Sequence, residues 1–298
     1  MRRRWSIPLS TLVLAIGSVA VATSAAASSP AARPGGAHSP QPIHVAQPGG
    51  PASNMLRPHT SSASRSAGNA TSTNWSGYAA TGSTYTSVSA SWTEPTATCH
   101  SGSQYSSFWV GLDGDGSNSV EQTGSEADCQ GSTPQYYSWY EMYPAAPVNF
   151  SNPVSPGDQF TGSVTYNGGS SFTLKLSDTT KGWSQTVNQS LPGAARASAE
   201  VIVEAPSSVS GVLPLADFGK VNFSGSTVDG SQLSSLNPTE ITMVSRNGTQ
   251  EDSVSALSGG SFGVTWDSSG QGGRHHGGGG GTACGRGGWS WWHRTCGH

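Results

Sequence analysis

Two short stretches carry side chains that could do chemistry from within β-strands. In SVEQTG (119 to 124), the amide Gln122 follows Glu121 and points to the opposite face of the strand. In AEVIVE (199 to 204), Glu200 and Glu204 share one face while valines occupy the other. A carboxylate can activate water, and a neutral amide can donate a hydrogen bond to an oxyanion at any pH. These residue types therefore allow hydrolysis of an amide or an ester.

Histidine is nearly absent from the part of the chain that can form a core. Between Thr71 and Asp267 there is one histidine, His100, in a polar loop beside Cys99. A Ser-His-Asp or Cys-His site needs a histidine next to a nucleophile, and a hydrolytic zinc site usually takes two or three. Both are excluded, and no metal or organic cofactor is expected. Carboxylates, amides and aromatic side chains remain.

The residues alone leave alternatives open. Glu141 shares a strand face with Trp139 and Tyr143, so Glu141 and Glu200 could be the carboxyl pair of a glycosidase. The tryptophans could instead be stacking platforms of a lectin-like module. A third interpretation treats Gln122 and Glu200 as ordinary polar residues on the solvent face of a sheet.

The elements that must position these residues are strands. Period-two runs occur at 86–92, 107–112, 136–143, 159–166, 171–176, 199–204, 240–245 and 261–266. Turn residues separate the runs, and no segment shows a helical period. The sequence predicts an all-β fold, an antiparallel β-sandwich of two sheets in a single domain.

Acidic residues are concentrated in this domain. All 17 Asp and Glu lie between positions 94 and 267, together with five basic residues, so the domain carries a net charge of about −12 at neutral pH. Such a surface repels nucleic acid and anionic lipid. After the carboxylates are protonated, few positive charges remain to repel one another, so the composition suits low pH.

The two ends of the chain have different compositions from the domain. Residues 1–27 have three arginines, an apolar run from Leu12 to Ala22 and small residues, which is typical of a secretory signal peptide. The run is too short for a membrane span. Residues 28–70 are predicted to be a disordered propeptide or linker, and 268–298 a Gly/His/Trp-rich disordered tail that contains Cys284 and Cys296. We expect a secreted monomer.

Cys99 and Cys129 are the only cysteines of the domain. In a secreted protein an isolated pair is most simply a disulfide. The bond would join the loop before 107–112 to the loop after EQTG (121 to 124).

Six ordered blocks resemble a known family. They are NWSGY (74 to 78), FWVGLDGDG (108 to 116), EQTG (121 to 124), SWYEMYP (138 to 144), AEVIVE (199 to 204) and LADFGKVNF (215 to 223). The chain resembles the glutamic peptidases, also called eqolisins or peptidase family G1. The resemblance implies a two-sheet, concanavalin-like β-sandwich, secreted as a zymogen, that cleaves proteins and peptides in acid.

The resemblance also implies roles for individual residues. The catalytic glutamine of the family falls on Gln122 and its catalytic glutamate on Glu200, whereas Glu204 is not catalytic by this match. Glu200 would be the general base and Gln122 the oxyanion donor. Residues that line the substrate cleft fall on Trp75, Trp139, Glu141 and Tyr143.

This chain departs from the family pattern at three positions. Glu121 stands where an aliphatic residue is common, Val201 where tryptophan is common, and Tyr137 where some members carry an acid. The dyad is intact, but these changes bear on subsite preference and on the acidity of Glu200.

Overall fold

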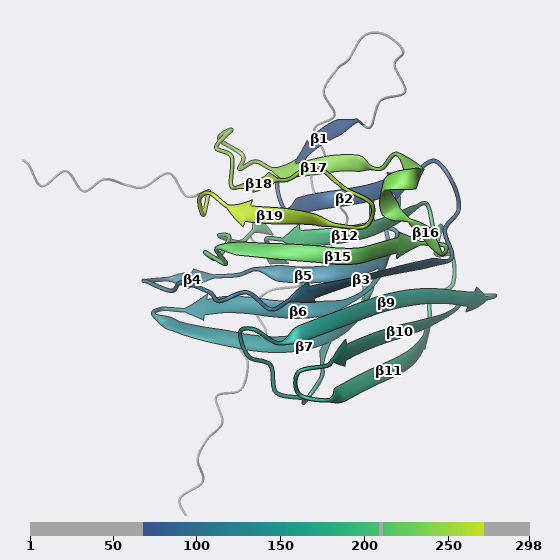
Figure 1. Cartoon of the computed structure of the whole chain (residues 1–298), viewed down its shortest axis with the longest axis horizontal. Coiled ribbons are helices and arrows are strands. Elements are labelled where there is room, and N and C mark those ends of the chain that lie inside the picture. The colour runs from purple at the N-terminus through teal and green to yellow at the C-terminus, as the bar shows by residue number, and fades with distance from the viewer. Residues whose placement is uncertain (1–67, 209–210, 271–298) are drawn as a thin grey trace, which may run out of the picture. The chain divides into compact units, whose positions relative to one another are not determined.

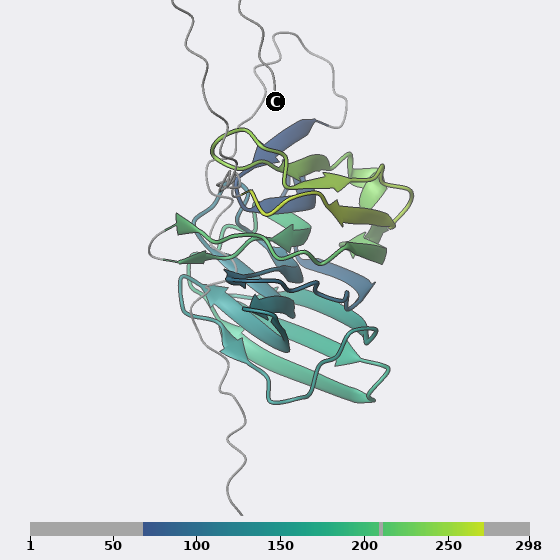
Figure 2. The same ribbon diagram turned by 90° about the vertical axis from the view of Figure 1, so that its left-hand side faces the viewer.

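The computed structural model describes residues 68–208 and 211–270. These residues form two large β-sheets that lie face to face, as Figures 1 and 2 show from two directions. A two-stranded ribbon, β13 (Ser207–Ser208) and β14 (Gly211–Val212), and one short 3₁₀ helix, η1 (Leu233–Leu236), complete the described elements. The predicted all-β sandwich is confirmed.

The first sheet has nine strands and carries the residues singled out above. Its order is β1 (Asn69–Ser72), β17 (Thr239–Met243), β2 (Trp75–Thr81), β12 (Ser198–Glu204), β5 (Ser107–Leu112), β6 (Val120–Gln130), β7 (Thr133–Tyr143) and β8 (Val148–Asn149), and β4 (Ser103–Gln104) also pairs with β6.

The second sheet has eight strands. Its order is β11 (Trp183–Ser190), β10 (Ser171–Asp178), β9 (Gln159–Gly168), β3 (Ser87–Thr93), β15 (Lys220–Val228), β19 (Phe262–Trp266) and β18 (Asp252–Val254), and β16 (Ser231–Gln232) pairs with β15.

Pairing is antiparallel throughout these sheets except between β1 and β17, which are parallel. Strand β1 includes Asn69 and Ala70, which composition assigned to the linker, and Ala70 is buried. A short polar segment can join a sheet through its backbone alone, so composition does not reveal it.

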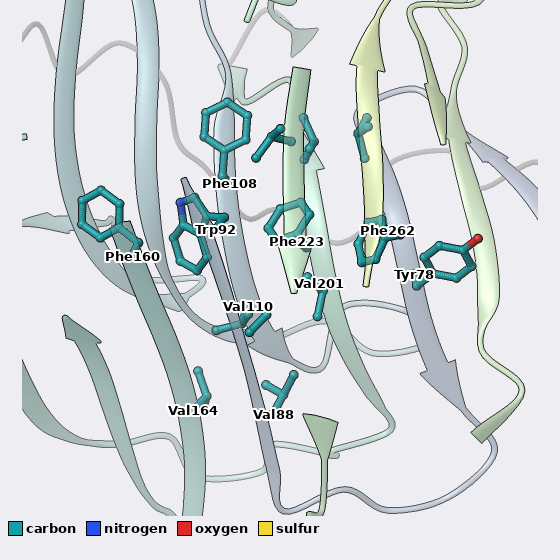
Figure 3. Packing of buried hydrophobic residues seen from close by; sticks show 14 of the residues in the cluster. Tyr78, Val88, Trp92, Phe108, Val110, Phe160, Val164, Val201, Phe223 and Phe262 are labelled. Atoms are coloured by element: carbon teal, nitrogen blue, oxygen red, sulfur yellow. The ribbon is translucent and has the colours of Figure 1, made fainter. Parts of the chain in front are cut away.

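Apolar residues that alternate along the strands fill the space between the sheets. Trp92 of β3 stacks on Phe160 of β9 with ring centroids 5.7 Å apart, and Val110 and Val201 approach from the first sheet (Figure 3). Strands β5 and β12 are buried at every residue, unlike β9, which alternates between exposed and buried. The first sheet therefore has two buried faces, and its second face carries the polar residues of interest.

A disulfide joins Cys99 to Cys129, as predicted. It ties the segment before β4 to the C-terminal end of β6, the strand that holds Gln122. Cys284 and Cys296, like the predicted signal peptide and most of the predicted linker and tail, lie outside the described residues.

Candidate active site

Strand register brings Gln122 and Glu200 to the same face of the first sheet. Gly111 of β5 is paired with Gln122 of β6 on one side and with Glu200 of β12 on the other. Directly opposed residues project to the same face. The two side chains therefore flank Gly111, with their Cα atoms about 10 Å apart, because two strand spacings separate them. Side chains reaching inward from that separation can contact one small group from both sides.

Gly111 lies between Gln122 and Glu200 in the sheet and forms the floor of the candidate site. A Cβ atom at this position would lie 2.9 Å from Cζ3 of Trp109 and 3.1 Å from Cβ of Gln122. Any side chain here would displace either the Trp109 ring or the Gln122 side chain.

We expect Gly111→Ala to lower turnover by about 100-fold, since a displacement of about 1 Å at a reacting group has that effect. Steady-state kinetics on a peptide substrate measures it. Equal kcat values for Gly111→Ala and the wild type would contradict this role for Gly111.

Glu141 holds the amide of Gln122. Nε2 of Gln122 donates to Oε2 of Glu141 at 2.7 Å, and the two residues are paired across β6 and β7. The pKa of Glu141 is raised to about 9, and burial is the largest cause. The hydrogen bond from Gln122 lowers this pKa, and the charge of Glu204 contributes to raising it. An amide nitrogen has two hydrogens, so the contact with Glu141 uses one and leaves the other able to donate to a ligand.

If Glu141 orients this amide, Glu141→Ala is expected to reduce kcat about ten-fold or more with little change in KM, because the amide loses its fixed rotamer. Glu141→Gln keeps an acceptor oxygen and is expected to stay within about three-fold of the wild type. Steady-state kinetics of both variants on one peptide distinguishes an orienting role for Glu141 from direct contact with the substrate. A change in KM alone would instead indicate direct contact with substrate.

Glu200 is fully buried among other acids. Burial raises its pKa well above the usual value, the Ser198 side chain lowers it, and Asp115, Asp113 and Glu121 raise it again. Among the described residues, neither carboxyl oxygen of Glu200 has a hydrogen-bond partner. While it is buried in this way, the carboxyl group therefore holds a proton in acid. The interpretation of Glu200 as a solvent-face residue is wrong, since it is 0 % exposed.

Glu204 shares its strand face with Glu200 but makes different contacts. Its Oε2 accepts from Nε1 of Trp109 at 2.9 Å, and its Oε1 accepts from Nδ2 of Asn74 at 3.3 Å. Trp109 packs edge-on against Trp75, with ring centroids 5.0 Å apart. Glu204 thus anchors the tryptophan cluster beside the candidate site.

The remaining predicted site residues are on the same face. Trp75 and Trp139 belong to its apolar cluster, and Tyr143 packs against it while half-buried. Gly111 and Trp109 were not predicted as site residues, although both lie within the FWVGLDGDG block. The signal that could have identified Gly111 is a glycine paired with polar residues on both neighbouring strands. This signal can be recognised only when the order of the strands in the sheet is known.

In the part of the chain that the structure describes, no group of three or more His, Cys, Asp or Glu is arranged to hold a metal ion. The same residues include no helix long and apolar enough to cross a membrane.

Comparison with known proteins identifies the family. The model of the Peptidase A4 family matches residues 73–266, which is nearly the whole of both sheets. The chain belongs to the Peptidase A4 family. Aspergillopepsin-2 of Aspergillus niger is 30 % identical over 224 residues, covering 65 % of this chain and 78 % of that protein. Scytalidopepsin B of Scytalidium lignicola is 32 % identical over 170 residues, covering 55 % of this chain and 59 % of that protein.

Solved structures of this peptidase family share the fold. Scytalido-glutamic peptidase in complex with a transition state analog inhibitor superposes with a TM-score of 0.58 at 28 % identity, covering 65 % of this chain and 98 % of that one. Aspergilloglutamic peptidase from Aspergillus niger gives a TM-score of 0.50 at 29 % identity, covering 55 % of this chain and 99 % of that one. This member of the Peptidase A4 family is therefore a peptidase, and the resemblance drawn from the six blocks is confirmed.

Proposed function

We propose that this peptidase is a secreted endopeptidase that works in acid with Glu200 and Gln122 as its catalytic dyad. The observation that carries the proposal is the pairing of both residues with Gly111, which directs the two side chains to the same face of the sheet on either side of that glycine. Glu200 removes a proton from water, and that water attacks the scissile carbonyl carbon. The free N–H of Gln122 donates to the oxyanion. Protonated Glu200 then delivers the proton to the leaving amine.

The mechanism requires Glu200 as a carboxylate, whereas the buried carboxyl is protonated in acid. Burial is the largest cause of its raised pKa. Entry of water and peptide replaces the low-dielectric surroundings with dipoles that stabilise the anion, and this lowers the pKa toward the ordinary value of about 4.3. The acid limb of the pH–rate profile therefore reports Glu200 in the hydrated site.

We place the substrate-binding residues on the same face. We assign Trp75, Trp139 and Tyr143 to contacts with peptide side chains because they belong to, or pack against, the apolar cluster on the sheet face that carries Gln122 and Glu200. Glu141 then supports catalysis through Gln122. A glycosidase using Glu141 and Glu200 is not favoured, since Gln122 and Gly111 lie between them in the sheet and Oε2 of Glu141 accepts from Nε2 of Gln122.

The test is peptide release from denatured casein or haemoglobin between pH 2 and 7, with and without a chelator. Release confined to acid and unaffected by the chelator supports the proposal. Release that requires a metal ion, or that is greatest at neutral pH, would exclude it.

We further propose that the protein is made as a zymogen with residues 28–70 as its propeptide. This segment has three arginines and three histidines but no carboxylate, opposite in sign to the domain. Acid protonates the carboxylates of the domain and weakens the attraction. The precursor is expected to remain intact at pH 7 and to remove its own N-terminal segment near pH 3 to 4.

N-terminal sequencing and mass after an acid shift measure this processing, with the Glu200→Gln precursor run in parallel. Trimming of that variant at the wild-type rate, with no other protease present, would rule out self-processing by the dyad.

A further inference from the structure

A small cavity is lined by none of the residues assigned to the dyad or to substrate binding. Its volume is about 180 Å³, and segments from distant parts of the sequence meet at its wall. Engineered protein cavities of about 150 Å³ take up a molecule of the size of benzene. This cavity therefore has room for one small organic group, and its wall offers a buried carboxyl group, a cation and an apolar surface.

Glu251 supplies the buried carboxyl group. The residue is 6 % exposed, and its Oε2 atom has no hydrogen-bond partner among the described residues. Its backbone is fixed, since its N–H donates to the carbonyl of Met243 at 2.9 Å and its carbonyl accepts from the N–H groups of Asp267 at 2.9 Å and Ser268 at 3.0 Å. A buried polar atom without a partner costs free energy. At the wall of a cavity, such an oxygen indicates a ligand that supplies the missing partner.

Arg246 supplies the cation. The residue is exposed, and among the residues that the structure describes it forms no ion pair. Its guanidinium group lies against the backbone of β14, because a Cβ atom on Gly211 would be 3.1 Å from Nη2. The guanidinium group can therefore receive an anion beside the cavity that Arg246 lines.

Val212, Leu213 and Pro214 form the apolar wall of the cavity. All three are half-buried, and the N–H of Leu213 donates to the carbonyl of Pro206 at 2.9 Å, which holds this segment in place. Removal of this wall and of an apolar group of the ligand from water is favourable.

Together these groups select a carboxylate that is attached to a small apolar group. A guanidinium group binds a carboxylate through two parallel hydrogen bonds. Burial raises the pKa of Glu251 to about 7, and the charge of Asp252 contributes. The Glu251 carboxyl therefore keeps its proton in acid and can donate a hydrogen bond to the same carboxylate. The charged side chains from the segments packed around Glu251 are Arg246, Asp252 and Asp267.

We propose that this cavity binds the C-terminal residue of a peptide, with its carboxylate on Arg246 and Glu251 and its apolar side chain against the apolar wall. Each peptide bond that the enzyme cleaves leaves one new C-terminal carboxylate, which has a pKa of about 3.3 to 3.7 and is an anion above about pH 4. The cavity thus holds a product of the reaction away from the dyad. The product assignment rests on the proposed function, whereas the carboxylate site itself does not.

Isothermal titration calorimetry with N-acetyl-leucine at pH 5 tests the site, on the full chain with Glu200→Gln so that no digestion occurs. We expect N-acetyl-leucine to bind, and N-acetyl-leucine amide to bind at least about ten-fold more weakly because it lacks the carboxylate. Acetate, which lacks the apolar group, is also expected to bind more weakly. No binding of N-acetyl-leucine, or equal affinity for the acid and its amide, would overturn the proposal.

A tripeptide that ends in leucine distinguishes the two sources of such a carboxylate. It is expected to bind as tightly as N-acetyl-leucine, because the cavity contacts the last residue alone. If N-acetyl-leucine binds and the tripeptide does not, the site takes small free acids and the assignment to a peptide product is wrong.

Two substitutions locate the binding. Arg246→Gln is expected to lower the affinity for N-acetyl-leucine by about ten-fold or more and to leave that for the amide unchanged. Glu251→Gln keeps a hydrogen-bond donor but cannot ionise. The parent protein is expected to bind about ten-fold more weakly at pH 8.5 than at pH 5, because ionised Glu251 repels the carboxylate, whereas Glu251→Gln binds equally at both. An affinity of the parent protein that does not change with pH would contradict the role of Glu251.

Gln122→Ala in the same background is the control, since a carboxylate could also bind at the dyad. It is expected to leave the affinity for N-acetyl-leucine unchanged. Loss of binding in Gln122→Ala but not in Arg246→Gln would place the ligand at the dyad and refute the cavity as its site. Binding is measured without turnover, so its failure leaves the dyad assignment standing, and failure of the dyad assignment leaves the binding result intact.

Discussion

Replacing Glu200 with glutamine is expected to reduce kcat/KM by at least about 1,000-fold, because the reaction would lose the group that we propose as its general base and proton donor. Gln122→Ala is expected to lower kcat by about 100- to 1,000-fold, the usual effect of removing one oxyanion donor. Both side chains are fully buried, and neither substitution introduces a charge. Circular dichroism and the melting temperature should therefore show a folded protein in each case.

Glu204→Gln is the matched control on the same strand face. Glu204 accepts from Trp109 and Asn74, and a glutamine oxygen can still accept from the indole N–H. Its kcat/KM is expected to stay within about ten-fold of the wild type. Turnover by Glu200→Gln comparable with that of Glu204→Gln would show that the base is another residue.

The second large effect expected is a steep loss of stability between acid and neutral pH. Burial raises the pKa of eight carboxyl groups. For three of them, Asp128, Glu251 and Asp252, the raised pKa is about 7. The other five are Glu94, Glu121, Glu126, Glu141 and Glu200. Asp229 shows the reverse shift, because hydrogen bonds from Thr86 and Ser87 outweigh its desolvation.

The sign follows from proton binding. A group whose pKa is higher in the folded state holds its proton more tightly there, so its contribution to stability is complete below about pH 4 and is lost as pH rises through the folded value. For the three groups near 7, the loss spans about pH 4 to 8. With eight groups shifted upward, we expect the melting temperature to be highest near pH 3 to 4 and to fall by at least about 10 °C by pH 8.

Calorimetry on Glu200→Gln, which avoids self-digestion, measures this dependence. Asp252→Asn provides a control, since its Oδ1 accepts from Ser76 at 2.5 Å and from the N–H of Met243 at 3.1 Å, and an amide oxygen can accept both. This substitution removes one titrating group and should flatten the slope. A melting temperature that rises from pH 4 to 8 would refute the expected direction.

The sequence by itself determined the fold class and the strand faces. Alternation in 199–204 sends Val201 and Val203 to the core between the sheets and Ile202 to the opposite apolar cluster, as the structure confirms. This works because side chains alternate strictly along a strand, so a local pattern suffices. The isolated cysteine pair was predictable for a similar reason, since no other partner exists within the domain.

Only the tertiary structure decided which strands are neighbours. The sequence distance from Gln122 to Glu200 says nothing about β5 lying between β6 and β12, and therefore nothing about Gly111 as the floor of the site. The contact of Gln122 with Glu141 likewise depends on register between strands.

The burial of Glu121 and Glu200 also required the tertiary structure. A polar residue in an alternating strand normally marks the solvent face, but here the central strands of the first sheet are covered on both faces. Local pattern specifies the direction in which a side chain points, whereas the packing of distant segments decides whether water is found there. The perturbed acidity of this site, and with it the expected pH dependence, is a property of that packing.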